Sequence, residues 1–389
     1  MNPKIAEIFG PVNAADSDRD LLAYSTDASR ISGEAKMVLH PTRMEQIQKF
    51  VQYARRSGMN IVPRGAGTGI VGGAVPQGSI VLDMSKMSRI LELREDYVVV
   101  EAGVIFSDVN DILKDRDLHI PVDSEINRGR TVGGMLATNA VGLRIMEHGR
   151  IEDWVEEVEI VDGTGHHVKL KRDEAKNFCG TEGIAGVIVR AKLRVLPVDK
   201  ERSLSILSFN TITAMMEKVD ELKQDSNVKM ILYLDDTCSE LLDLGSSIHL
   251  FVEYASGEGE ITNEFEIAEA IGMVESLDGK LKASRRIIRE DPRVPSSELP
   301  KFLNWLRKYN IPNYGNVDVG LIHPYFLEGS SYEISELYKV VKSIHGSVGW
   351  EHGLGLLKKE HASPERKRKL EILKKHYDPS GIMNRGKVL

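Results

Sequence analysis

Two histidines and a glutamate in the last third of the chain could support metal and proton chemistry. His323 ends the segment Asn-Val-Asp-Val-Gly-Leu-Ile-His, and Glu351, His352 and Gly353 follow one another. His323 and Glu351 offer nitrogen and oxygen donors that suit a divalent ion, and His352 beside such an ion would be a base near neutral pH. Neighbouring side chains on an extended segment point to opposite faces, so Glu351 and His352 converge only through the turn that Gly353 permits. Such histidines are also common as satisfied core or surface residues, and Glu-His-Gly recurs by chance.

A glycine-rich loop is the densest chemical signal in the first half. Five glycines lie within nine residues directly after an expected strand at Ile61 and Val62, with Arg64 beside them; they are Gly65, Gly67, Gly69, Gly72 and Gly73. Glycines free the backbone to turn successive N–H groups around an anion, and a pyrophosphate is the natural ligand. An ordinary flexible loop is the alternative interpretation.

The same loop matches the dinucleotide fingerprint of the Rossmann fold through Gly67, Gly69 and Gly72. That fingerprint requires a helix of several turns to start in the loop. Here Pro76, Gln77 and Gly78 intervene, and the next strand begins at Ile80, which leaves no room for the helix. The match is therefore accidental.

Strands and helices alternate through the first 200 residues. A strand at Lys36–Leu39 precedes a helix that Thr42 and Glu45 would open as a capping box and Gly58 would close. Ser107 can cap a helix that runs to about Lys114. Further strands are expected at Ile80–Asp83, Leu91–Leu93, Val98–Glu101, around the Asp162-Gly163 turn, and at Gly186–Leu196.

The pattern of expected helices and strands changes near residue 200. Well-formed strands and an amphipathic helix follow at Ser203–Phe209, Thr213–Leu222, Lys229–Leu234 and Ile248–Tyr254. This order predicts a second, α+β domain with an antiparallel sheet and helices on one of its faces. A chain of 389 residues is long enough for two domains that each bury a core.

Composition excludes several classes of protein. The chain has 51 Lys and Arg against 58 Asp and Glu, a net charge of −7, which argues against nucleic-acid binding. Its only cysteines, Cys179 and Cys238, argue against a disulfide scaffold, a cysteine zinc site and an iron–sulfur cluster, and leave a single disulfide conceivable. No stretch approaches the roughly 18 apolar residues of a bilayer-spanning helix, and no basic stretch leads into an apolar run at the amino end. We therefore expect a cytoplasmic protein.

Several segments taken together resemble a known flavoprotein fold. The glycine loop, Thr131-Val132-Gly133-Gly134, Asn139–Gly142, His148-Gly149 and Gly180–Gly186 are similar to the FAD-binding domain of the vanillyl-alcohol oxidase and p-cresol methylhydroxylase (PCMH) superfamily over residues 30–198. The resemblance implies FAD contacts from Arg64, Gly65, Ala66, Gly67, Thr68, Gly69, Gly72, Gly73, Ser124, Thr131, Gly133, Gly134, Asn139, Gly142, Gly149, Gly183 and Val187. Some members bond flavin to a histidine, but relatives nearest by motif usually have tyrosine at the position of His148, so we expect non-covalent FAD.

Motifs in the last third extend the resemblance to nearly the whole chain. The segment Glu-His-Gly-x-Gly and the tail Asp-Pro-x-Gly-x-x-Asn-x-Gly-Lys are similar to FAD-linked D-lactate, glycolate and D-2-hydroxyglutarate dehydrogenases. The resemblance implies that Glu351 is a metal ligand with His323, that His352 is the catalytic base, and that Asn384 adjoins the flavin. A second histidine ligand of the family falls at Asn316 here, so zinc, iron, manganese or no metal could serve.

The segment that binds the substrate carboxylate in these relatives looks shortened. Arg289 resembles the family's basic residue before an Asp-x-x-x-Pro motif and is the expected carboxylate partner, with Arg285 or Arg286 next. The helix upstream has no arginine at the expected spacing. Arginine suits bidentate pairing with a carboxylate, although these residues could equally be basic residues on an exposed strand.

The resemblance implies an α+β protein with a two-subdomain PCMH-type FAD domain over residues 1–198. A ferredoxin-like substrate domain is expected over 199–370 and a tail over 371–389 that returns to the flavin.

The implied activity is FAD-dependent oxidation of a small D-2-hydroxy acid, similar to D-lactate or glycolate. The electron acceptor would be a quinone, a cytochrome, an electron-transfer flavoprotein or oxygen, reached at the membrane periphery if need be. A homodimer is conceivable. The alternatives are the alditol, aldonolactone or alkyl-glycerone-phosphate branch, or a flavin subunit with no active site of its own.

Overall fold

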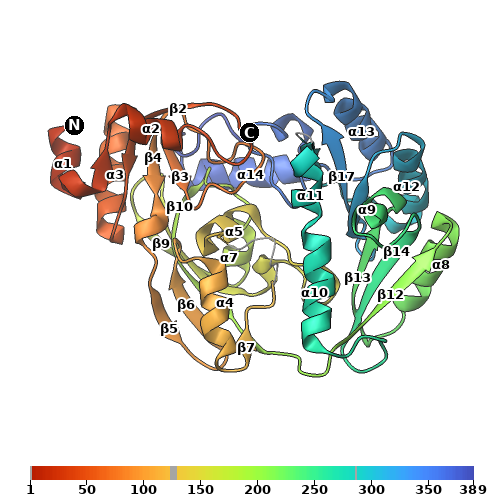
Figure 1. The fold of residues 1–389 in the computed structure, drawn as a ribbon. Coiled ribbons are helices and arrows are strands. Elements are labelled where there is room, and N and C mark those ends of the chain that lie inside the picture. Colours follow the sequence, from red (N-terminus) through yellow and green to blue (C-terminus); the bar gives the residue numbers. More distant parts are fainter. Residues whose placement is uncertain (1, 123–128, 285–286) are drawn as a thin grey trace.

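The computed structural model describes residues 2–122, 129–284 and 287–389. Its amino-terminal lobe begins with a small sheet in the order β1-β2-β4-β3, in which β2, β4 and β3 are parallel (Figure 1). The predicted β-α-β unit is confirmed, because β2 and β3 flank a helix that Gly58 ends in the left-handed conformation. The elements are α1 (Pro3–Phe9), β1 (Ala14–Ala15), α2 (Asp18–Tyr24), β2 (Glu34–Leu39), α3 (Met44–Ser57), β3 (Ile61–Arg64) and β4 (Gln77–Asp83).

An antiparallel sheet in the order β5-β6-β10-β8-β9 forms the second half of this lobe. Its long central strand β10 pairs with β6 on one side and β8 on the other, and α5 packs against it. The elements are β5 (Ile90–Leu93), β6 (Tyr97–Glu101), α4 (Phe106–Lys114), β7 (Leu118–His119), α5 (Val132–Thr138), α6 (Ile145–His148), β8 (Val155–Asp162), β9 (His167–Lys171), α7 (Asp173–Phe178), β10 (Gly186–Arg194) and β11 (Leu196–Pro197).

Two predicted helix caps are wrong. The backbone N–H and hydroxyl of Thr42 both donate to the Gln46 side chain, at 2.8 and 3.1 Å, so Gln46 and not Glu45 reaches back over the start of α3. Ser107 lies inside α4, which begins at Phe106, and its hydroxyl donates to Asp108. Helix α4 follows Ile105 and has no side-chain cap.

The carboxyl-terminal lobe holds an antiparallel sheet in the order β12-β14-β13-β16-β17-β15. The α+β class is confirmed, but the expectation of helices on a single face is wrong. One face packs against α8, α12 and α13, whereas the other packs against α9, α10 and α11. The elements are β12 (Ser203–Phe209), α8 (Ile212–Leu222), β13 (Val228–Leu234), α9 (Asp236–Leu241), β14 (Ile248–Tyr254), α10 (Glu264–Glu275), α11 (Leu277–Ser284), β15 (Ile287–Arg289), α12 (Leu299–Lys308), β16 (Asn313–Asn316), β17 (Leu321–Leu327) and α13 (Ser331–Ser343).

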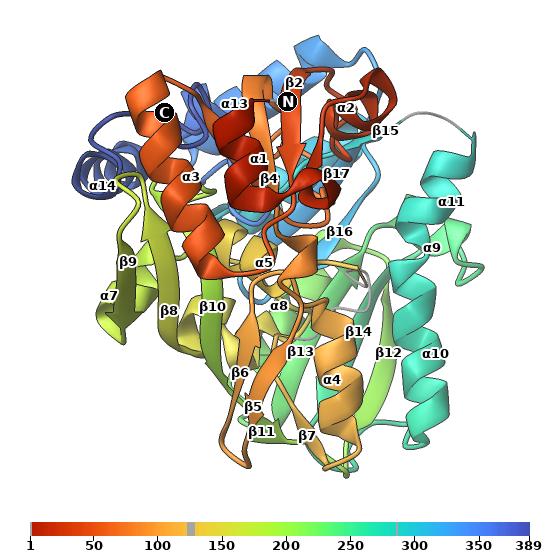
Figure 2. The same ribbon diagram turned by 90° about the vertical axis from the view of Figure 1, so that its left-hand side faces the viewer.

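The end of the chain crosses back to the amino-terminal lobe. Helix α14 (Pro364–Tyr377) places Tyr377 edge-on against Phe178 of α7 at a ring-centroid distance of 5.7 Å. Figure 2 shows α14 beside β9. After the helix, Met383 forms a parallel bridge with Ile61 at the start of β3. The tail therefore reaches the strand that carries the glycine loop.

Both cysteines are buried and free. Within the described ranges, no helix has the length and apolar character needed to cross a bilayer.

Candidate active site

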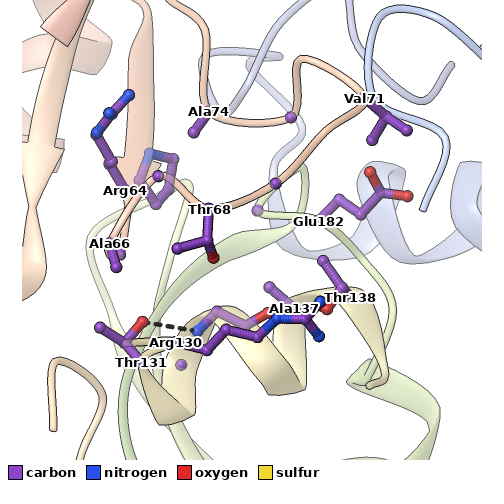
Figure 3. A pocket seen from close by; sticks show the side chains of 18 of the residues that line it. Arg64, Ala66, Thr68, Val71, Ala74, Arg130, Thr131, Ala137, Thr138 and Glu182 are labelled. Carbon is purple, nitrogen blue, oxygen red and sulfur yellow. Dashed lines mark hydrogen bonds between the residues drawn. The ribbon is translucent and has the colours of Figure 1, made fainter. Parts of the chain in front are cut away.

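One cavity brings together the glycine loop and the polar residues of the carboxyl-terminal lobe. It is lined by the loop after β3, the start of α5, the Gly-Thr-Glu-Gly turn before β10, and residues of α11, β15 and the Glu-His-Gly segment. Figure 3 shows the loop on one side of the cavity and α5 on the other. The sequence-predicted site residues that line it are Arg64, Gly65, Ala66, Gly67, Thr68, Gly69, Gly73, Thr131, Gly133, Gly134, Gly183, Val187, Arg289, Glu351 and His352.

The cofactor side of the cavity is mostly backbone. A Cβ atom on Gly65 would lie 2.2 Å from the Thr131 hydroxyl oxygen, so the glycine lets the loop approach the start of α5. That hydroxyl accepts the backbone N–H of Gly134 at 3.2 Å and caps α5, while the N–H groups of Val132 and Gly133 donate to the carbonyls of Val104 and Ala102. A cavity wall of glycine-rich backbone with little side-chain bulk fits a dinucleotide such as FAD.

Arg64 places its guanidinium against the loop, where a Cβ atom on Gly67 would lie 2.3 Å from one of its terminal nitrogens. It donates to the carbonyl of Thr26 at 2.8 Å and lies 5.3 Å above the Tyr24 ring. Burial lowers its pKa, an effect that nearby Asp27 and Asp83 oppose. Arg64 thus braces the loop from behind while its neighbours face the cavity.

Five predicted cofactor residues do not line the cavity, namely Gly72, Asn139, Gly142, Gly149 and Asn384, and Ser124 lies outside the described residues. Asn139 ends α5 in the left-handed conformation and accepts the N–H of Glu152. Gly149 ends α6 with a φ of +67° and a ψ of −136°, outside the left-handed helical region. His148 packs against His119 and Trp154 and does not line the cavity. These positions shape the second glycine region from outside.

Asn384 supports the cavity from behind. Its side-chain amide donates to the carbonyls of Gly73 at 3.1 Å and Glu182 at 2.7 Å, and it accepts from the Lys387 ammonium at 2.7 Å. Lys387 also donates to Gly73, and burial lowers its pKa to about 7. The tail therefore ties the glycine loop to the Gly-Thr-Glu-Gly turn.

His323, Glu351 and His352 come together as their residue types indicated. One ligand atom from each lies within 4.8 Å of the others, and His323 Nε2 is 3.2 Å from a Glu351 oxygen. The turn at Gly353 has a φ of +87°, in the left-handed region that glycine favours. Burial acts to raise the Glu351 pKa, but His323, His352 and Arg289 together outweigh it, and the net pKa lies below the usual range. A carboxylate and an imidazole at this spacing fit a divalent ion.

Asn316 lies on β16, two residues from Tyr314, the residue paired with His323. Its amide nitrogen donates to the carbonyl of Leu143 at 2.6 Å, and the residue does not line the cavity. Its amide thus already joins the two lobes, and its role as a third ligand stays a prediction.

A buried carboxylate fixes the Glu-His segment. Asp291 accepts the backbone N–H groups of Glu351 and His352 at 2.7 and 2.6 Å, and it pairs with the Lys358 ammonium at 2.5 Å. Neither ring nitrogen of His352 has a hydrogen-bond partner within the described residues. Burial lowers the His352 pKa to about 3, although nearby Asp291 opposes the shift, so the ring is neutral with a lone pair to accept a proton.

Arg289 enters the cavity already partnered. Its guanidinium pairs with Asp278 of α11 at 3.2 Å and lies 3.3 Å from the Tyr314 hydroxyl, while Tyr325 donates to the same carboxylate at 2.6 Å. Burial disfavours its charge, but Tyr314 and Asp278 prevail, and the pKa is raised above its usual value. The predicted carboxylate-binding arginine is present, with a carboxylate of the protein beside it. The other two candidates, Arg285 and Arg286, lie outside the described residues.

Sequence reasoning missed three charged residues of the cavity: Arg130, Glu182 and Asp278. Glu182 accepts the N–H groups of Leu354 and Gly355 at 2.8 and 2.9 Å, and its burial raises its pKa. A visible signal existed for two of them, because Glu182 lies inside the quoted Gly-Thr-Glu-Gly turn and Arg130 directly precedes Thr131. Asp278 lies on a helix with no motif, and only the fold brings it to Arg289.

Comparison with known proteins agrees with this geometry. Residues 35–171 match the family described as FAD binding domain, and residues 252–388 match the C-terminal domain of FAD linked oxidases. Glycolate oxidase subunit GlcD of Bacillus subtilis is 24% identical over 100% of this chain and 96% of its own length. D-2-hydroxyglutarate dehydrogenase of Stutzerimonas stutzeri is 24% identical, with 96% and 95% covered. D-lactate dehydrogenase of Archaeoglobus fulgidus is 26% identical, with 99% and 98% covered.

A solved structure shares the fold over nearly the whole chain. An alkyldihydroxyacetonephosphate synthase superposes with a TM-score of 0.72 at 16% identity, and the match covers 99% of this chain and 85% of that one. The two-lobed architecture is therefore an established fold.

Proposed function

Because the chain belongs to the FAD-linked oxidase family, we propose that it oxidises a small D-2-hydroxy acid, similar to D-lactate or glycolate, to the 2-oxo acid. The single observation that carries the proposal is the cavity shared by the FAD-type backbone cradle, Glu351, His352 and Arg289. The three relatives named above are called after glycolate, D-2-hydroxyglutarate and D-lactate, which supports the class of acid. FAD is proposed to bind without a covalent bond.

Each residue has a proposed role. Bound FAD would supply a hydride acceptor, and a divalent ion would supply a Lewis acid for the hydroxyl group. His352 accepts the hydroxyl proton, because neither of its ring nitrogens has a hydrogen-bond partner in the described part of the chain. His323 and Glu351, with Asn316 as the third candidate, hold the ion. Asp291 positions the Glu-His segment through its two backbone hydrogen bonds. The electron acceptor would be a quinone, a cytochrome, an electron-transfer flavoprotein or oxygen.

Anaerobic titration of the flavin tests the proposal. The purified holoenzyme is mixed with D- and L-lactate, glycolate and D-2-hydroxyglutarate, and with alditols for the rival branch of the superfamily, while the absorbance of oxidised flavin is followed. We expect bleaching by a D-2-hydroxy acid and retention of the yellow flavin without bleaching in His352→Ala. Bleaching by alditols alone, or undiminished bleaching in the variant, would contradict the proposal. Metal content measured on the same samples tests the ion.

A further inference from the structure

Arg130 is the cation of the cavity that the proposed reaction does not yet use. It lies at the entrance to α5, directly before Thr131, and its backbone carbonyl accepts the N–H of Phe106 at 2.8 Å, which fixes the start of its side chain. Figure 3 shows the side chain stretched along α5 toward Ala137 and Thr138, across the cavity from Thr68. It is partly buried and lines the same cavity as Glu351 and His352.

Among the residues that the structure describes, Arg130 has no partner in direct contact with its charge. No hydrogen bond or ion pair reaches its guanidinium from the residues that the structure describes. Burial lowers its pKa to about 10, with Glu351 acting against the shift and Arg289 adding to it, so the group is still charged at neutral pH. A partly buried guanidinium without a partner is costly unless a ligand supplies an anion.

Arg289 is already partnered at one end of its guanidinium, although its buried Nε has no hydrogen-bond partner within the described residues. Asp278 and Tyr314 already occupy its NH1 group, and its side chain is 10% exposed. A substrate carboxylate at Arg289 would meet the Asp278 carboxylate in the same place and be repelled by it. The helices before β15, α10 and α11, contain no arginine between Glu264 and Ser284 that could take over.

We propose that Arg130, reaching in from the FAD-binding lobe, is the residue that binds the substrate carboxylate, and that Arg289 is a positioning residue held by Asp278 and Tyr314. This inference rests on the proposed function for the identity of the acid. A bidentate guanidinium fixes both oxygens of a carboxylate, and so sets which hydrogen of the neighbouring carbon faces the flavin. Arg130 would thereby govern both affinity for the acid and choice of enantiomer.

A binding experiment without turnover tests this residue. Holoenzyme is titrated with propionate, which has the carboxylate but no hydroxyl group, and with propionamide, its uncharged counterpart, and binding is followed by the flavin difference spectrum. We expect Arg130→Gln to raise the Kd of propionate by about 10- to 100-fold, the range for a hydrogen-bonded charged group, while the Kd of propionamide and the FAD content do not change. Arg130→Lys keeps the charge but loses the paired N–H donors of the guanidinium, and we expect it to raise the Kd of propionate several-fold. Exposed Arg56→Gln is the matched control.

The outcomes separate this inference from the proposed function. Loss of FAD in both Arg130 variants would overturn it and assign the guanidinium to the cofactor phosphates. An unchanged Kd for propionate, or no propionate binding to the unaltered protein, would also overturn it. If Arg130→Gln does not fold, the Lys variant decides by the same criteria. Arg130-dependent propionate binding in a protein whose flavin no hydroxy acid reduces would sustain this inference and end the proposed function. If D-lactate bleaches the flavin and neither Arg130 variant weakens that bleaching, the proposed function is sustained and this inference is overturned.

Discussion

The two sides of the cavity are built from different materials. The side from the amino-terminal lobe is largely backbone, brought close by glycines such as Gly65, whereas the side from the carboxyl-terminal lobe is a network of buried ionisable groups around Asp291. A backbone cradle depends on the absence of side chains, so its sequence signature is local and dense. A charge network depends on partners far apart in the chain, so it leaves little local trace. The difference predicts that the two sides fail differently when they are altered.

The largest effect is expected from breaking the charge network. Asp291→Ala removes a fully buried carboxylate and leaves the Lys358 ammonium with Glu290 as its remaining ion-pair partner in the described structure. Removing one partner of a buried ion pair costs about 3–5 kcal/mol, and we expect the free energy of unfolding in urea to fall by that amount, with loss of flavin reduction. Exposed Asp111→Ala is the control. A loss below about 1 kcal/mol, the range of surface pairs, would show that the network is dispensable.

A pH series should locate a second buried acid in the same lobe. Burial raises the pKa of Asp318 to about 7, and its Oδ2 atom has no hydrogen-bond partner within the described residues. The folded protein therefore keeps this proton where the unfolded chain has lost it, so the contribution to stability present below about pH 4 is lost as the pH rises toward about 7. Asp318→Asn should flatten this fall by about 2–4 kcal/mol in urea unfolding, at about 1.4 kcal/mol per pKa unit. Parallel curves for wild type and variant, as expected for exposed Asp220→Asn, would refute the assignment.

The backbone side should fail by losing its cofactor at little cost in stability. Gly65→Ala places a methyl group against the Thr131 hydroxyl and pushes the loop from the start of α5. We expect FAD affinity to fall about tenfold, which corresponds to about 1.4 kcal/mol, measured by flavin fluorescence on dilution. Gly257→Ala is the control, because a Cβ there meets nothing within 4 Å. Unchanged FAD affinity would mean that the loop does not depend on this close approach.

The backbone side of the cavity could be predicted from the sequence, whereas most of the charged side could not. The β-α-β unit and the glycine loop were predictable because their signals, apolar periodicity and glycine density, are local. Helix α5 was not predicted, because Gly133 and Gly134 have low helix propensity and the Thr131 cap compensates only in the folded chain. The faces of the second sheet were misjudged, because strands such as β14 are buried along their whole length and show no alternation. Asp278 became a site residue only through tertiary contacts, and no spacing rule reaches that far, whereas Arg130 stood beside the quoted Thr131 segment and was overlooked.

The hydrogen bonds of Asn384 also bear on when the glycine loop gains its support during synthesis. Its amide reaches the carbonyl of Gly73, which lies 311 residues earlier in the chain. A nascent chain on the ribosome carries the complete glycine loop long before this support has been synthesised. The loop therefore lacks this support for most of translation, and we expect it to bind FAD firmly only after residue 384 has been synthesised.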